Sequence, residues 1–178
     1  TSMCYPVSSM GSHVSVVPNH QLNRKTPLHT RANVAYFGTF GYELDLNKLS
    51  DEEISEVKQQ ITFMKEYREL IQFGTFYRLK SPFEGNETAW MTVSEDKKTA
   101  LVFWYRERNV VNADFTRVRL QGLDPDLIYR NEYNGTENYG DELMNLGLLT
   151  TDCTAGEPTS EDEPCTDYES RIYVLTAK

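Results

Sequence analysis

The spacing of the apolar residues changes near residue 76, and this change limits the folds that the chain can adopt. Before that point, apolar residues recur every three or four positions in two stretches, as they do in amphipathic helices. After it, short runs of β-branched and aromatic residues alternate with turn clusters at intervals of about ten residues. We therefore predict an α/β domain over residues 1–75 and an all-β domain over residues 76–178.

The first domain is predicted to contain two strands, each followed by a helix. The apolar run at 3–7 and the weakly alternating run at 40–46 are the predicted strands. The first helix is predicted to begin at Pro27 with Thr26 as its N-cap, because proline suits the first helical position. Its apolar face is formed by Leu28, Ala32, Ala35 and Tyr36.

A second, longer helix has the clearest boundaries. Ser50 and Glu53 form a capping box, and Gly74 ends the helical pattern. Two strand–helix units cannot cover both faces of a parallel sheet, so we expect further strands upstream of residue 1. The apolar stripe of this helix is formed by Ile54, Val57, Ile61, Met64, Tyr67, Leu70 and Ile71.

The second domain is predicted to be an antiparallel β-sandwich. Residues that favour turns gather at 95–98, 122–125 and 134–135, between runs that favour strands. The predicted strands are 76–79, 88–94, 100–106, 117–120, 127–132 and 171–175.

The charge and hydropathy of the chain exclude two classes of partner. A net charge of −9 argues against an electrostatic interaction with nucleic acid. No stretch approaches the ~20 apolar residues that a membrane-spanning helix needs, so no membrane contact is expected.

An acidic segment at 152–169 is predicted to be an exposed loop. Six carboxylates and no basic residue lie between 157 and 169, and such a segment cannot bury itself. A calcium site is the alternative. Cys153 and Cys165 flank this charge cluster and would form a disulfide in an exported protein, although reduced thiols are the default for three cysteines without CxxC spacing.

Several motifs of the chain resemble those of a known enzyme family. The resemblance is to bacterial α-galactosidases of glycoside hydrolase family 36, and it covers residues 1–150 and resumes at Ser170. The motifs that carry it are MGSHVS at 10–15, VPNHQ at 17–21, AYFGTFGYELD at 35–45, YRELIQFG at 67–74, YRLKSPF at 77–83 and YGDELMN at 139–145.

The resemblance implies a fold and an activity. The chain would hold the last two βα units of a (β/α)8 TIM barrel, followed by a C-terminal antiparallel β-sandwich. The parent enzyme would remove terminal α-galactosyl units from melibiose and raffinose-type sugars by a retaining mechanism. Its Asp nucleophile and Asp acid/base would both lie upstream of residue 1, so no catalytic residue is expected here and the isolated chain should be inactive. Glu43 and Asp45 do not match the family's catalytic motifs, and Glu43 is expected to be an ion-pair partner.

A polar loop is the candidate substrate-binding segment. If residues 3–7 form a barrel strand, the loop after them lies on the C-terminal face, where TIM barrels bind their substrates. The alternative is a loop that only packs against the barrel, with His13 buried and hydrogen-bonded. The candidate substrate-binding residues are Ser12, His13, Asn19 and His20.

No cofactor or metal is expected, because the three histidines lack metal-ligand spacing and the retaining mechanism needs none. The resemblance implies a cytoplasmic bacterial enzyme that forms homo-oligomers, with secretion the alternative if Cys153 and Cys165 pair. Two other functions remain open for the chain: an oligomerisation module, or a carbohydrate-binding module. In the second case Trp90, Trp104 and Tyr105 would stack on sugars, although Trp90 in a strand fits a core position better.

Overall fold

A computed structural model describes residues 2–110, 115–150 and 167–178. The chain forms two compact units, residues 1–74 and residues 75–178. Cys153, Cys165 and most of the predicted acidic loop lie outside the described residues.

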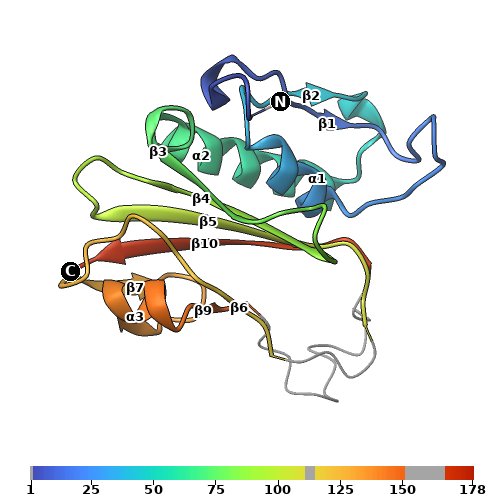
Figure 1. Ribbon diagram of the computed structural model, residues 1–178. Coiled ribbons are helices and arrows are strands. Elements are labelled where there is room, and N and C mark those ends of the chain that lie inside the picture. The colour runs from blue at the N-terminus through green and yellow to red at the C-terminus, as the bar shows by residue number, and fades with distance from the viewer. Residues whose placement is uncertain (1, 111–114, 151–166) are drawn as a thin grey trace. The chain divides into compact units, whose positions relative to one another are not determined.

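The first unit combines a small parallel sheet with helices on one side of it (Figure 1). Strands β1 and β2 pair in parallel, with Val14 opposite Tyr42 and Ser15 opposite Glu43. The elements of this unit are η1 (Val7–Ser9), β1 (Val14–Ser15), α1 (Leu28–Ala35), β2 (Tyr42–Glu43), η2 (Leu46–Lys48) and α2 (Asp51–Phe73).

The predicted strand at 3–7 is wrong. Residues 2–4 form a turn, and Pro6 then caps the short 3-10 helix η1 at Val7–Ser9. Pro6 lacks the N–H that a strand in a ladder donates, so the apolar run cannot continue as a paired strand. The first strand of the unit is β1, seven residues further along the chain at Val14–Ser15.

Helix α1 begins one residue later than predicted. Its N-cap is Pro27 and not Thr26, and the helix starts at Leu28. The predicted apolar face is confirmed, because Leu28, Ala32, Ala35 and Tyr36 are all buried.

Helix α2 is confirmed at both ends. The Ser50 hydroxyl accepts from the Glu53 N–H at 3.2 Å, and a Glu53 carboxylate oxygen accepts from the Ser50 N–H at 2.9 Å. The helix ends at Gly74, whose N–H donates to the Leu70 carbonyl. Val57, Met64 and Ile71 of the predicted stripe are buried, and so is Gln60, which the apolar pattern did not include.

The second unit is built on a six-stranded antiparallel sheet of order β3-β4-β5-β10-β7-β8, with a separate two-stranded ladder of β6 and β9 (Figure 1). All six predicted strands are present with shifted ends. The elements are β3 (Thr75–Lys80), β4 (Glu87–Val93), β5 (Thr99–Arg106), β6 (Arg117–Val118), β7 (Ile128–Asn131), β8 (Glu137–Tyr139), α3 (Gly140–Asn145), β9 (Leu148–Leu149) and β10 (Glu169–Ala177).

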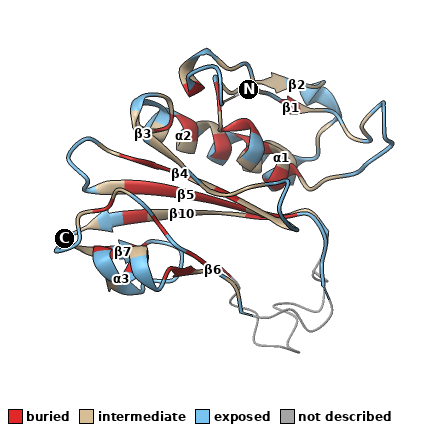
Figure 2. Ribbon diagram, in the orientation of Figure 1, coloured by how far each residue is buried: buried red, intermediate tan, exposed pale blue. Residues whose placement is uncertain are grey.

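One face of the six-stranded sheet carries the core of this unit. The register places Met91, Val102 and Tyr173 in one row across β4, β5 and β10, and all three are buried. Strand β5 is buried along most of its length (Figure 2). Residues of β6, β9 and α3 pack on this face and complete a two-layer core. They contribute Val118, Leu143 and Leu148, and the segment after β6 adds Leu120 and Leu123.

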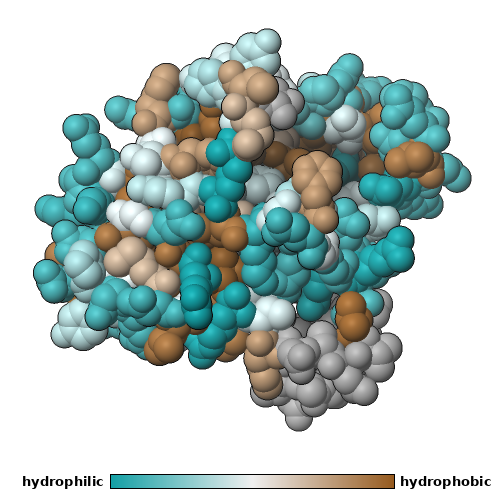
Figure 3. Space-filling view, in the orientation of Figure 1, coloured by the Kyte–Doolittle hydropathy of each residue, from teal (hydrophilic) through white to brown (hydrophobic). Residues whose placement is uncertain are grey.

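Strand β8, helix α3 and strand β9 were not predicted. Each has six residues or fewer, so none is long enough to show a clear apolar period. The visible surface of the molecule is largely hydrophilic, with apolar residues exposed among the polar ones (Figure 3).

Candidate functional site

The β1–β2 pair divides the polar residues of the first unit into two faces. Val14 is fully buried, and the Tyr42 hydroxyl donates to the Gln60 side chain of α2, so these two paired residues point toward the helices. Side chains alternate along a strand, so His13 and Glu43, one position away, point to the opposite face.

On that opposite face, His13 and Glu43 contact each other. The His13 Nε2 atom lies 2.6 Å from Glu43 Oε2, within hydrogen-bond distance. The two side chains are 49% and 73% exposed in this chain, which holds only two strands of the barrel. Glu43 is an ion-pair partner when His13 is protonated, as the sequence predicted.

Ser12 is fixed to the end of α1. Its hydroxyl donates to the Ala35 carbonyl. Two residues before Ser12, the Met10 carbonyl accepts from the Thr39 N–H at 2.9 Å. Gly38 makes this approach feasible, because a Cβ atom at that position would lie 2.6 Å from Met10 O. Segment 10–12 is therefore held by close backbone packing.

Asn19 forms a turn with its own neighbours. Its side-chain oxygen accepts from the N–H groups of Gln21 and Leu22, both at 3.0 Å, and its N–H donates to the Arg24 carbonyl. His20 lies in this turn and is exposed. The Asn19 side chain thus shapes the loop that follows β1.

Arg31 of α1 closes the base of that loop. Its Nη1 donates to the Ser15 carbonyl at 2.6 Å, and its Nε donates to the Thr26 carbonyl at 3.0 Å. Burial lowers the pKa of the Arg31 guanidinium, and the negative charges of Glu53 and Glu56 oppose that change. One side chain therefore holds both ends of the loop over residues 16–25.

A partly buried series of hydrogen bonds links β2 to α2. Tyr42 donates to Gln60 Oε1 at 2.8 Å, and Gln60 Nε2 donates to Glu56 at 2.7 Å, while the Tyr36 hydroxyl donates to the Gln60 carbonyl. Burial and the nearby charge of Glu56 raise the pKa of Tyr42 to about 12, and burial also raises the pKa of Tyr36. The sequence feature that could have indicated these hydrogen bonds is a polar residue, Gln60, between apolar positions of a helix.

The four predicted substrate-binding residues are divided by β1. Ser12 and His13 precede the strand and Asn19 and His20 follow it, because the strand lies at Val14–Ser15 and not at 3–7. Among the described residues, no hydrogen bond or ion pair joins any two of the four.

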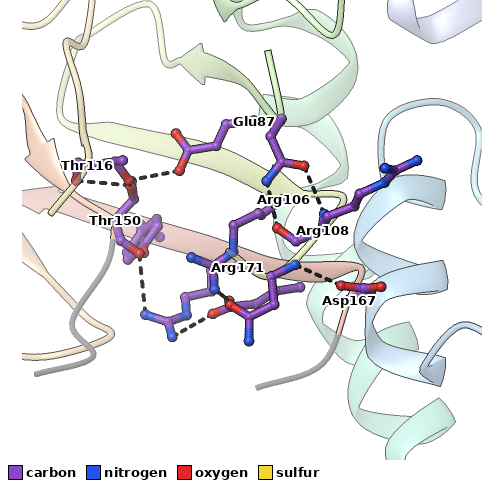
Figure 4. A network of polar contacts seen from close by, with 11 residues as sticks. Glu87, Arg106, Arg108, Thr116, Thr150, Asp167 and Arg171 are labelled. Carbon is purple, nitrogen blue, oxygen red and sulfur yellow. Dashed lines mark hydrogen bonds and ion pairs between the residues drawn. The ribbon is translucent and has the colours of Figure 1, made fainter. Parts of the chain in front are cut away.

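The second unit carries a partly buried network of charges at one end of its sheet (Figure 4). Glu169 of β10 binds Arg106 of β5 through one carboxylate oxygen and Arg171 through the other, at 2.8 Å. Glu87 of β4 lies in the same row and accepts from the Thr116 hydroxyl at 2.8 Å. The row therefore ties β4, β5 and β10 to the segment that leads into β6.

A surface hollow of about 320 Å³ lies beside this network, between the end of β3 and the start of β4. The Lys80 ammonium and the Glu87 carboxylate form an ion pair in its lining. This hollow is in the second unit and contains none of the predicted substrate-binding residues.

None of the three aromatic residues considered for sugar stacking, Trp90, Trp104 and Tyr105, is exposed. Trp104 is completely buried in the core. Trp90 is half-buried, and its ring stacks on Tyr105 at 4.6 Å between centroids. Trp90 lies outside the core cluster of this unit, so its predicted core position is wrong.

Over the part of the chain that the structure describes, no group of three or more His, Cys, Asp or Glu side chains is placed to hold a metal ion. Within the same residues, no helix is both long and apolar enough to cross a bilayer. Cys4 is a free, exposed thiol.

Two family matches cover most of the chain. Residues 1–74 match the Melibiase family, and residues 87–175 match the glycosyl hydrolase family 36 C-terminal domain. The chain is 53% identical over 148 residues to α-galactosidase AgaA of Geobacillus stearothermophilus, covering 83% of this chain and 20% of that protein. It is 45% identical over 177 residues to α-galactosidase 1 of Pediococcus pentosaceus, covering 99% of this chain and 23% of that protein.

Solved structures show the same fold. An AgaA variant in complex with 1-deoxygalactonojirimycin matches with a TM-score of 0.90 and 46% identity, over 99% of this chain and 23% of that one. The galactosidase domain of the α-galactosidase–sucrose kinase AgaSK matches with a TM-score of 0.88 and 42% identity, over the same shares of the two chains. The chain thus spans about a fifth of the length of these relatives. It belongs to glycoside hydrolase family 36, of which it holds the end of the melibiase TIM barrel and the antiparallel C-terminal β-sheet domain.

Proposed function

We propose that this chain is the C-terminal part of a retaining α-galactosidase that hydrolyses terminal α-galactosyl residues of melibiose and raffinose-type sugars. The match of residues 1–74 to Melibiase carries the proposal. Solved structures of AgaA variants in complex with raffinose and with stachyose support this class of substrate.

The catalytic carboxylates are proposed to lie upstream of residue 1. Retention needs two carboxyl groups about 5 Å apart, one as nucleophile and one as acid/base. The carboxylates at the end of β2 are already used locally: Glu43 contacts His13, and Asp45 accepts from the Asn47 backbone at 3.1 Å. The role of the chain is then to complete the barrel with residues 1–75 and to support it with residues 76–178.

The loop after β1 is proposed to border the sugar pocket. It leaves the C-terminal end of a barrel strand, the end at which TIM barrels build their active sites. Asn19 and His20 belong to this loop, whereas Ser12 and His13 precede the strand and lie at its N-terminal end. Replacing His20 with Ala in the full-length enzyme should raise the Michaelis constant, and an unchanged value would contradict contact with substrate.

Hydrolysis of p-nitrophenyl α-D-galactopyranoside tests the proposed function. The 178-residue chain and the full-length protein that carries it are assayed side by side. We expect turnover by the full-length protein alone. Comparable turnover by the chain alone would show that the catalytic pair lies within it, and Glu43 and Asp45 would be the first residues to replace.

Assembly and location are further parts of the proposal. We propose a homo-oligomeric enzyme in the bacterial cytoplasm. Light scattering of the full-length protein with and without residues 76–178 tests the assembly. A monomer in both cases would exclude homo-oligomers and the oligomerisation role of the β-domain.

A further inference from the structure

The face of the β1–β2 pair that carries His13 and Glu43 has a defined place in a closed barrel. In a (β/α)8 barrel, side chains alternate between the outer helices and the barrel interior. Val14 and Tyr42 point toward α1 and α2, which lie together on one side of the strands (Figure 1). His13 and Glu43, of opposite parity, therefore point into the barrel.

The height of the pair follows from the register. Ser15 and Glu43 are opposite each other and are the last residues of β1 and β2. Glu43 thus lies on the rung nearest the C-terminal mouth, and His13 lies two residues below Ser15. Interior layers take their side chains from alternate strands, so a contact between neighbouring strands joins two successive layers.

The Glu43 carboxylate needs a hydrogen-bonding partner if it lies inside a closed barrel. Burying one ionised group alone is costly, whereas a hydrogen-bonded pair offsets much of that cost. His13 is this partner, because its Nε2 atom lies 2.6 Å from Glu43 Oε2. The contact needs only β1 and β2, both of which this chain contains. The loop anchored by Arg31 begins directly after Ser15.

We infer that His13 and Glu43 form an interior pair that fixes the C-terminal ends of the last two barrel strands and thereby positions the loop over residues 16–25 at the sugar pocket. The inference rests on the proposed α-galactosidase function. Both residues are positioning residues: they act through the strands and the loop, and not on the reacting atoms.

The test is a double-mutant cycle in the full-length protein, with His13→Gln, Glu43→Gln and the double variant. Each single variant should raise the Michaelis constant about fivefold with kcat within about twofold, because a distorted pocket weakens ground state and transition state alike. The double variant should be no worse than either single variant, since both remove the same contact. His13→Lys keeps a cation opposite Glu43 and should restore most of the affinity.

Glu66→Gln is the matched control, because Glu66 lies on the exposed side of α2. It should leave the Michaelis constant unchanged. Variants that lower the melting temperature but leave the Michaelis constant unchanged would overturn the positioning role, and so would additive effects in the double variant. An unmodified protein without α-galactosidase activity would overturn the proposed function, and the inference with it.

Discussion

Arg106 and Glu169 lie directly opposite each other on β5 and β10, and their side chains form an ion pair from which solvent is largely excluded (Figure 4). The Arg106 side chain is 8% exposed and the Glu169 side chain 21%. The second carboxylate oxygen of Glu169 binds Arg171. The Glu169 carboxylate therefore contacts two positively charged guanidinium groups, those of Arg106 and Arg171, at the end of the sheet.

Replacing Glu169 with Gln should destabilise the β-domain strongly. The change leaves the charges of Arg106 and Arg171 in a poorly solvated site, so we expect a loss of about 2–3 kcal/mol in the free energy of unfolding. Urea unfolding followed by tryptophan fluorescence measures this, because both tryptophans, Trp90 and Trp104, lie in this unit. Glu132→Gln is the control: its contact with Arg130 is long, at 3.8 Å, and half-exposed, so it should change stability by less than about 0.5 kcal/mol. Equal effects of the two variants would contradict a special role for Glu169.

Replacing Gly140 with Ala should disrupt the start of α3. A Cβ atom there would lie 1.9 Å from the Asp124 carbonyl oxygen, and a backbone atom cannot move aside as a flexible side chain can. We expect a loss of about 3 kcal/mol, measured by the same urea unfolding. Gly85→Ala meets open space and should stay within about 0.5 kcal/mol of the wild type. A neutral Gly140→Ala variant would mean that the two segments are further apart than described.

Removing the capping box should weaken α2. Ser50→Ala leaves the Glu53 N–H without its acceptor and should cost about 1 kcal/mol. Ser55→Ala, in the exposed interior of the same helix, should instead stabilise it by about 0.4 kcal/mol, because alanine has the higher helix propensity. Unfolding followed by circular dichroism at 222 nm distinguishes the two, and the prediction fails if both variants change stability in the same direction.

Alkaline pH should unfold the first unit in part through Tyr42. Its pKa in the folded protein is raised to about 12, whereas a tyrosine in the unfolded chain ionises near pH 10. The stability that this raised pKa contributes is complete below about pH 10 and is lost as the pH rises toward 12. In an absorbance titration at 295 nm, Tyr42→Phe should remove one of the late-ionising tyrosines. In urea the two proteins should titrate with the same midpoint, and a late component that persists undiminished in the folded variant would contradict the prediction.

The elements that sequence predicted well are those whose signals are local and repeated. The capping box of Ser50 and Glu53 defines the start of α2, and runs of β-branched and aromatic residues between turn clusters indicate β4, β5 and β10. The run at 3–7 does not form a strand although it is apolar, because Pro6 has no N–H to donate to a ladder. Strands of two residues, such as β1 and β2, hold too few side chains to show any period.

The candidate site was predicted in part. Sequence motifs placed His13 and Glu43 in the α/β domain and gave Glu43 an ion-pair role, but they did not make the two residues partners. That contact joins positions thirty residues apart, and it depends on the parallel register of β1 and β2. The partly buried link from Tyr42 through Gln60 to Glu56 depends in the same way on how α2 packs against β2.

The sequence by itself determined the family, the order of α/β and antiparallel β segments, and the long elements, because motifs, caps and apolar periods are properties of neighbouring residues. The tertiary structure decided which strand precedes the polar loop, which face of that strand each side chain occupies, and which charges share a partner, as Arg106, Glu169 and Arg171 do. The physical reason is that register and packing bring distant residues together, and a one-residue shift in a strand moves every side chain to the other face.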